Sequence, residues 1–175
     1  RWIYENQNAN IGLGNLSTSI ATHPRLDGEG SGMHNKFIIG DADHAESAFV
    51  LTGSTNLTTG QLVSDLNNVI VLEDQSLARA YELEFEEMWG AEGMTPNAAN
   101  AKFGADKTWN TPVDFVVGGS PVELYFSPSD GTTAAIQAEI DAANANFEFA
   151  LLTLTRDDLG DAIVELNQSF FVSPI

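Results

Sequence analysis

The chain has 175 residues, 43% of them hydrophobic and 18% charged, a composition typical of folded globular proteins. Its formal net charge of −18 repels polyanions, so passive coating of nucleic acid or of an anionic membrane is disfavoured. The chain has no cysteine, which excludes disulfides and thiolate metal sites, and no apolar run approaches the roughly 20 residues of a membrane span.

Two neighbouring strands are the main prediction for the first third of the chain. Residues 2–5 are typical of the end of a strand, and residues 6–32, rich in Asn, Gly, Ser and Thr, predict a loop with one short helix. Residues 36–40 and 48–52 are short, apolar and rich in β-forming residues. They predict two adjacent strands joined by the polar loop 41–47.

A third strand and a long helix are predicted next. Residues 69–72 indicate the strand. Asp74 is a typical helix N-cap, apolar residues then recur at steps of three and four up to Trp89, and Gly90 suits the position after a helix end. We therefore predict an amphipathic helix whose apolar stripe, Trp89 included, belongs to the core.

The second half of the chain alternates between two kinds of element. Residues 91–120 turn to Ala, Asn, Gly, Thr and Pro without a sustained period, which predicts a linker. Residues 122–126 then predict a strand, 132–145 a helix, 147–154 a buried strand and 157–168 a second helix. This alternation favours parallel strands covered by helices, so the predicted fold class is α/β.

Candidate functional residues gather at the ends of the first two strands. Side chains alternate along a strand, so His34 and Lys36 should project from one face, about 6 to 7 Å apart between α-carbons. Gly53 lets the backbone come close to a ligand, and Ser54 and Asn56 offer a hydroxyl and an amide on one side. A neutral imidazole is a competent nucleophile toward phosphorus, and a lysine offsets the charge that develops on phosphoryl oxygens.

Taken alone, these residues leave alternatives open. A histidine two residues from a lysine is also what an exposed strand end shows. Asp41, Asp43 and His44 share one loop and could hold a cation, but polar turn residues more often face water. We predict no metal site there. His23 precedes Pro24 in a predicted loop, which indicates a surface histidine.

Six residues carry a resemblance to a known family. In chain order they are His34, Lys36, Asp41, Gly53, Ser54 and Asn56. Their spacing, His-x-Lys-(x)4-Asp followed by Gly-Ser-x-Asn, resembles the HKD signature of the phospholipase D superfamily of phosphodiesterases. The strand and helix predicted up to residue 90 look like those that follow this signature, so the resemblance covers residues 33–90.

Residues 122–128 and 149–155 resemble the opening of a second unit of the same kind, before its own histidine and lysine. The resemblance therefore implies three parts: residues 1–90 as the C-terminal part of a first HKD unit, 91–120 as a linker, and 121–175 as the truncated start of a second unit. It implies a phospholipase D-like sandwich of mixed or parallel sheet flanked by helices, in an incomplete bilobal arrangement. On this ground we expect the chain to be a fragment.

The resemblance also implies roles for the matching residues. His34 would be either the nucleophile that forms a phosphohistidine or the acid that protonates the leaving alcohol. Lys36, Ser54 and Asn56 would hold the phosphate. Asp41 matches the signature aspartate, and its place at a strand end predicts a structural or electrostatic role.

Two further positions are implied to support the histidine. Where many members carry a glutamate that orients the imidazole, this chain has Asn67 or Asn68, whose amide oxygen can accept the Nδ1 hydrogen. HKD chemistry, as the family implies it, needs no metal and no cofactor. The expected partners are a phosphodiester substrate and either a second HKD unit of the full-length chain or a second copy in a homodimer.

The implied function is that of a phosphodiesterase that hydrolyses or transfers phosphodiesters, and the isolated fragment is expected to be inactive. Because proteins normally bind nucleic-acid strands in cationic grooves, the charge of −18 favours phospholipid head groups slightly over nucleic acid as substrate. Two alternatives stay open: an HKD-type nuclease, and a catalytically silent phosphate-binding or interaction module.

Overall fold

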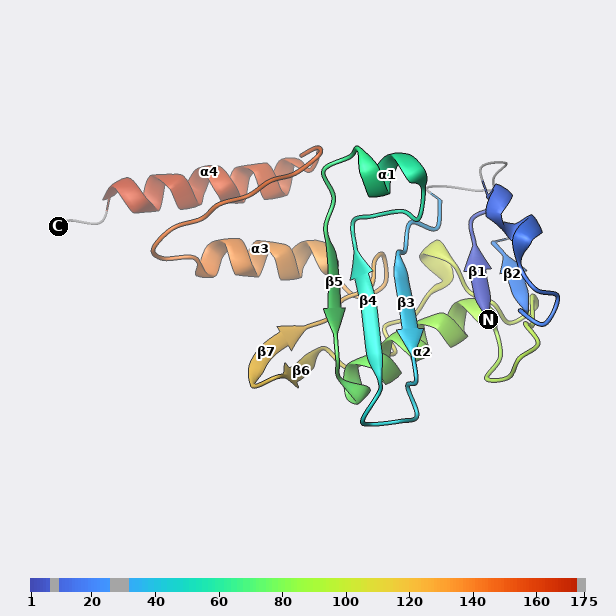
Figure 1. Cartoon of the computed structure of the whole chain (residues 1–175). Coiled ribbons are helices and arrows are strands. Elements are labelled where there is room, and N and C mark those ends of the chain that lie inside the picture. The colour runs from blue at the N-terminus through green and yellow to red at the C-terminus, as the bar shows by residue number, and fades with distance from the viewer. Residues whose placement is uncertain (7–9, 26–31, 173–175) are drawn as a thin grey trace. The chain divides into compact units, whose positions relative to one another are not determined.

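The computed structural model describes residues 1–6, 10–25 and 32–172, with side-chain exposure up to residue 168. It confirms the predicted α/β class and divides into two compact units, Arg1–Leu124 and Tyr125–Ile175 (Figure 1). None of the described helices is long and apolar enough to cross a membrane.

A three-stranded antiparallel sheet forms the platform of the first unit. Its strands are β3 (Phe37–Gly40), β4 (Phe49–Gly53) and β5 (Val69–Leu72), and β4 lies in the middle (Figure 1). Phe37 lies opposite Thr52 in the register of β3 and β4. The predicted adjacency of the first two strands and the predicted third strand are confirmed.

A second small sheet pairs β1 (Trp2–Tyr4) in parallel with β2 (Thr22–Pro24). The predicted loop between residues 6 and 32 thus contains a strand that periodicity did not reveal, besides the short 3-10 helix η1 (Ile11–Asn15). One more short helix, α1 (Thr59–Val63), follows β4. Parallel pairing, predicted for the second half of the chain, occurs among the described strands only between β1 and β2.

The prediction of a surface histidine at position 23 is wrong. His23 is 3% exposed, and its ring centroid lies 5.9 Å from that of Trp89 and 6.0 Å from that of Phe103. The imidazole therefore packs as an aromatic ring in the core. Burial lowers its pKa, because desolvation disfavours the charged form.

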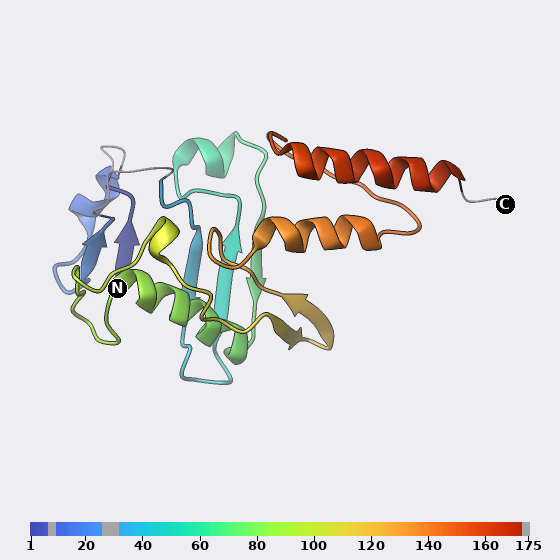
Figure 2. The same ribbon diagram turned by 180° about the vertical axis from the view of Figure 1, so that it is seen from behind.

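Helix α2 (Gln75–Trp89) matches the prediction at both ends. The Asp74 carboxylate accepts a hydrogen bond from the Leu77 amide at 2.8 Å, and Gly90 ends the helix in the left-handed conformation, with φ 74°. The helix contacts β1, β3 and β4 and crosses behind them, as the view from behind shows (Figure 2). Its apolar stripe joins the main core cluster, which contains Ile3, Met88, Trp89 and Phe103.

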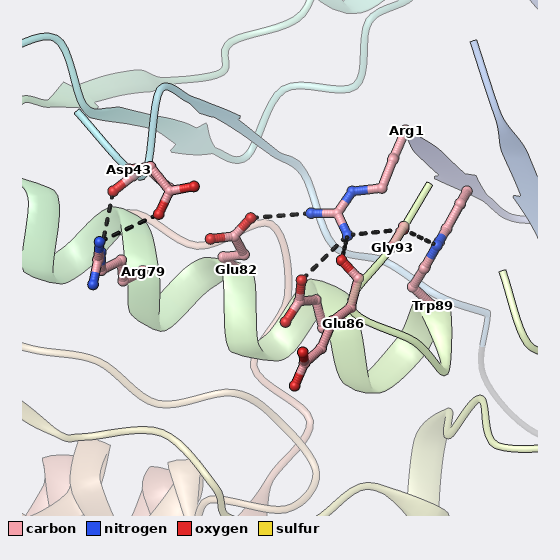
Figure 3. Close-up of polar contacts among 9 residues, drawn as sticks. Arg1, Asp43, Arg79, Glu82, Glu86, Trp89 and Gly93 are labelled. Atoms are coloured by element: carbon pink, nitrogen blue, oxygen red, sulfur yellow. Dashed lines mark hydrogen bonds and ion pairs between the residues drawn. The ribbon is translucent and has the colours of Figure 1, made fainter. Parts of the chain in front are cut away.

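Ion pairs tie the chain to the polar side of α2 (Figure 3). The Arg1 guanidinium lies 3.0 Å from a carboxylate oxygen of Glu82 and 3.2 Å from one of Glu86. Further along the helix, Arg79 lies 3.2 Å from the carboxylate of Asp43 in the β3–β4 loop. Both ends of α2 are thereby connected to segments distant in sequence.

The segment predicted as a linker, residues 91–120, contains ordered elements and buried side chains. After the short 3-10 helix η2 (Gly104–Asp106), the strands β6 (Asp114–Val117) and β7 (Ser120–Glu123) form an antiparallel hairpin. Its two-residue loop is Gly-Gly with positive φ at both positions, as tight hairpins require. Phe103 is only 8% exposed.

The second unit consists mainly of two helices, α3 (Thr132–Ala142) and α4 (Asp157–Val172), which pack on each other as a small cluster around Ile140. Both helices were predicted. The buried strand predicted over residues 147–154 is wrong: no strand forms there, and Leu152 is fully exposed. A buried strand needs backbone partners, and the described part of this unit contains no other strand to supply them.

Candidate active site

The β3–β4 hairpin brings four of the predicted residues to one end. Because Phe37 lies opposite Thr52, the residues just before Phe37 and just after Thr52 leave the hydrogen-bonded ladder together. We call this the site end of the hairpin. It carries His34, Lys36, Ser54 and Asn56.

The residues that lead into β3 differ in which of them contact α2. Met33 and Phe37 pack against the core cluster beneath α2, and the Asn35 amide contacts the same helix. His34 and Asn35 are both exposed, but of the two only the Asn35 side chain makes a hydrogen bond to the described residues of α2. The odd positions therefore face α2, which leaves His34 and Lys36 for the opposite side, where a ligand can reach them.

Lys36 is held close to His34. Its Nζ donates a hydrogen bond to the His34 carbonyl oxygen at 2.8 Å, and its own carbonyl oxygen accepts one from Thr52 Oγ1 at 3.0 Å. The side chain is half-buried, and this burial lowers the pKa of the Lys36 ammonium. The contacts place a cation beside the backbone of the candidate nucleophile.

Lys36 differs from the other cations of the chain in its partners. Every other lysine and arginine is ion-paired with a carboxylate; the pairs are Arg1 with Glu82 and Glu86, Arg25 with Glu5, Arg79 with Asp43, Lys102 with Glu87, Lys107 with Glu84, and Arg156 with Asp158. No carboxylate of the described residues pairs with Lys36. Among the described residues of a chain with a net charge of −18, the charge of Lys36 is the one left for an external anion.

Gly53 and Ser54 join the end of β4 to the residues before β5. Gly53 has φ 141°, and a Cβ at this position would lie 2.3 Å from the Asn68 carbonyl oxygen, so only glycine fits. The Ser54 hydroxyl donates to Asn67 Oδ1 and accepts from the Asn68 amide, both at 3.0 Å. Its single hydrogen is therefore already engaged.

The two asparagines lie beside Ser54 rather than beside the histidine. Asn67 offers its side-chain oxygen to the Ser54 hydroxyl, and the Asn68 carbonyl oxygen accepts from Ser54 N at 3.1 Å and from Thr55 Oγ1 at 3.0 Å. No hydrogen bond joins the His34 imidazole to any described residue. The structure thus brings Asn67 and Asn68 to the site end through the serine.

Sequence reasoning missed Gln61. Its side-chain oxygen accepts from both the Asn56 backbone amide, at 2.7 Å, and Asn56 Nδ2, at 2.9 Å. One hydrogen of the Asn56 amide is thus engaged and the other is left. The signal was Thr58-x-x-Gln61, a Thr/Ser-x-x-Gln/Glu capping pattern, and Thr58 does cap α1.

Asp41 lies at the opposite end of β3, the turn end of the hairpin. Four strand residues separate it from Lys36, so the two α-carbons are five residue steps apart, a span of roughly 16 Å. Its backbone has a positive φ of 50°, which aspartate tolerates, and its carbonyl oxygen accepts from the His44 amide at 2.8 Å. The structure does not bring Asp41 together with the other signature residues.

Comparisons with known proteins show similarity over the region that contains this hairpin. Residues 6–89 match the family model described as "Cardiolipin synthase, PLD-like domain". The chain is 35% identical over 65 residues to a mitochondrial cardiolipin hydrolase of Xenopus laevis. The aligned region covers 37% of this chain and 29% of that protein. It is 37% identical over 57 residues to the dog protein of the same name, and this alignment covers 33% of this chain and 20% of that protein.

The chain thus spans less than a third of the length of these curated relatives. No solved structure matches it with significance. The matched region contains the whole β3–β4 hairpin, helix α2 and all the signature residues. Residues 6–89 are thus similar to the PLD-like domain, which supports a relationship to the phospholipase D superfamily.

Proposed function

We propose that the chain is part of a phospholipase D-like phosphodiesterase in which His34 and Lys36 act on a phosphodiester without a metal ion. The observation that supports this most is the Lys36 ammonium, which has no carboxylate partner among the described residues and bonds the backbone of the exposed His34, while the other cations pair with carboxylates. The similarity of residues 6–89 to the PLD-like domain supports the same chemistry. Relatives are named as cardiolipin hydrolases, which are enzymes of this class.

Lys36 supplies the charge that the reaction requires. A phosphodiester carries one negative charge, and the transition state of attack at phosphorus spreads charge over the phosphoryl oxygens. A preorganised cation stabilises this charge more strongly where water is partly excluded, and Lys36 is half-buried. Its ammonium uses one hydrogen on the His34 carbonyl, which leaves two for phosphate oxygens.

His34 is the proposed nucleophile. Its neutral imidazole attacks phosphorus, the bond to the leaving alcohol oxygen breaks, and a phosphohistidine forms; water or a second alcohol then attacks phosphorus and releases the histidine. Asn56 has an amide hydrogen left for the phosphate. Ser54 has to turn its hydroxyl away from Asn67 before it can donate to a ligand. We assign Asp41 a role in the turn, in keeping with its distance from the site end.

The leaving oxygen needs a proton from the side of phosphorus opposite to His34. One histidine cannot occupy both sides, so the proposed enzyme uses a second histidine from another HKD unit or from a second copy of the chain. In the proposal, residues 1–90 are the C-terminal part of a first HKD unit and residues 121–175 the start of a second.

Among phosphodiesters we favour phospholipid head groups over nucleic acid. Tracking a nucleic-acid backbone takes a row of available cations, because affinity grows with the number of phosphates neutralised. Lys36 is the one cation in the described residues without a carboxylate partner. A single cation suits a single phosphate.

A silent phosphate-binding module is the second candidate. The observation that favours it is the His34 imidazole, for which no described residue acts as orienting hydrogen-bond acceptor. Such an acceptor normally fixes the tautomer of a catalytic histidine.

One set of assays separates these functions. The full-length protein is tested on phosphatidylcholine and on single-stranded DNA, with EDTA present, beside a His34→Ala variant. Turnover of the lipid that survives EDTA and depends on His34 is the expected result. DNA cleavage instead would move the proposal to a nuclease, and phosphate binding without turnover would establish the silent module. Loss of turnover on chelation, restored by a divalent ion, would contradict the metal-free mechanism.

A further inference from the structure

A buried ion pair lies directly under the His34–Lys36 segment. Glu84 of α2 and Lys107 both have side chains almost fully buried, at 1% and 3% exposure, and Lys107 Nζ lies 2.6 Å from Glu84 Oε1. The same Oε1 lies 3.4 Å from Asn35 Nδ2, which also contacts the Met88 sulfur at 3.7 Å. Asn35 is the residue between the candidate nucleophile and the candidate cation.

The backbone ladder does not fix this segment. Hydrogen-bonded pairing of β3 with β4 begins only at Phe37. Asn35 is itself exposed, but a slip of one residue would turn His34 and Lys36 toward α2 and move the Asn35 side chain away from it, because side chains alternate. What holds the segment before Phe37 are side-chain contacts: Glu5 on the Met33 amide at 2.6 Å, Glu84 on the Asn35 amide, and Thr52 on the Lys36 carbonyl.

Of these anchors, Glu84 is the one that the stability of the fold alone does not explain. Removing two charges from water costs several kcal/mol per ion, and apolar residues of similar volume often replace a buried pair without loss. The row around Asn35 is otherwise apolar, since Met33 and Phe37 pack on the core cluster. A polar Asn35 meeting a buried carboxylate therefore selects one register.

We propose that Glu84, with its charge balanced by Lys107, is a positioning residue that acts through Asn35 to present His34 and Lys36 on the ligand side of the hairpin. The proposal rests on the proposed function, since it assigns Glu84 a part in the same site. Neither Glu84 nor Lys107 touches the phosphate in it. Misplacing reacting groups by about 1 Å can cost about 100-fold in rate.

The test removes the pair without leaving a lone buried charge. A Glu84→Met, Lys107→Met double variant and an Asn35→Leu variant both delete the contact while they keep apolar volume. Glu87→Gln is the matched control, because Glu87 is a carboxylate of the same helix and its side chain is 4% exposed. Glu87 pairs with Lys102 and accepts hydrogen bonds from Thr108, not from Asn35. Circular dichroism verifies folding of each protein, and Asn35→Leu serves if the double variant does not fold.

The first readout needs no activity. Histidine is labelled with ¹³C and ¹⁵N, the His34 ring signals are assigned with His34→Ala, and their response to inorganic phosphate is followed by NMR. We expect the double variant and Asn35→Leu to shift the His34 signals and weaken the phosphate response at least about tenfold, with no change in Glu87→Gln. Unchanged His34 signals in both deletion variants would overturn the positioning role, whether or not the protein is an enzyme.

The second readout uses the full-length protein on bis(p-nitrophenyl) phosphate. Positioning predicts a fall of about 10- to 100-fold in kcat with little change in KM, and Asn35→Asp, which brings a second carboxylate to Glu84, should be as damaging as Asn35→Leu. If the wild-type protein showed no His34-dependent turnover, the proposed function would be contradicted. The NMR result would then decide by itself whether Glu84 positions His34. Equal losses in Glu87→Gln and in the Glu84 variant would overturn the positioning role.

Discussion

The two ends of the β3–β4 hairpin are held in opposite ways. At the turn end the Ala42 carbonyl oxygen accepts from Gln75 Nε2 at 3.1 Å and from Arg79 Nε at 3.3 Å, while Arg79 also pairs with Asp43 (Figure 3). At the site end, the Glu84 carboxylate accepts from the neutral Asn35 amide and Ser54 bonds Asn67, while among the described residues the cation Lys36 bonds only a backbone carbonyl. Asp43, in the turn-end loop, is thus paired with a cation, whereas Lys36, at the end where a ligand is proposed to bind, has no carboxylate partner among the described residues.

The largest difference between the two ends should appear when their histidines are exchanged for alanine. His34→Ala should lower phosphodiester turnover of the full-length protein by at least about 1,000-fold, because it removes the nucleophile. His44→Ala, at the turn end, should leave turnover unchanged. Both residues are exposed, so melting curves should stay within about 0.5 kcal/mol of the wild type. Equal losses at the two ends would refute the assignment of the site.

The cations of the two ends give the next largest effect. Lys36→Met should lower turnover by about 100-fold, since it removes the donor that stabilises charge on the phosphoryl oxygens. Arg79→Met should lower the free energy of unfolding by at most about 1 kcal/mol, because its pair with Asp43 is exposed, and it should not change turnover. Chemical denaturation and kinetics on the same preparations measure both. A rate loss in Arg79→Met as large as in Lys36→Met would contradict the comparison.

A glycine pair tests how tightly the site end is built. Gly53→Ala should destabilise the protein by about 1–3 kcal/mol, because its Cβ would meet the Asn68 carbonyl oxygen and its φ of 141° disfavours side chains. Gly60→Ala, in α1, meets nothing within 4 Å and should stabilise by up to about 1 kcal/mol. Urea unfolding of the two variants gives the comparison. A neutral Gly53→Ala would show that the contact with Asn68 is not maintained.

The smallest effect separates the exposed histidines of the hairpin from the buried one. The pKa of His23 is lowered in the folded state by burial, so below about pH 6.5 the unfolded chain takes up a proton at this position that the native state does not. Stability is therefore fully present above about pH 6.5 and is lost as the pH falls toward the folded-state pKa. Melting temperatures between pH 7.5 and 5.5 should fall less in His23→Phe than in wild type, and His44→Ala should follow the wild type. An identical fall in His23→Phe would exclude His23 as the source.

Local patterns were sufficient for elements whose signals lie within a few residues. The cap at Asp74, the apolar stripe and Gly90 determine both ends of α2, because helix hydrogen bonds and caps are made within the element. The pairing of β3 with β4 follows from two β-rich runs joined by a short loop. The apolar run at residues 147–154 misled for the converse reason, since a strand exists only where other strands accept its hydrogen bonds.

The sequence by itself determined which chemical groups leave the ladder together: the spacing of His34, Lys36, Ser54 and Asn56 around two strands suffices once those strands pair. Tertiary structure alone decided their partners. It put Asp41 roughly 16 Å away from Lys36 at the turn, joined the Ser54 hydroxyl to Asn67, and set Glu84 and Lys107, distant in sequence, beneath Asn35. Such contacts depend on how α2 packs against the sheet, and packing joins residues whose separation along the chain carries no periodic signal.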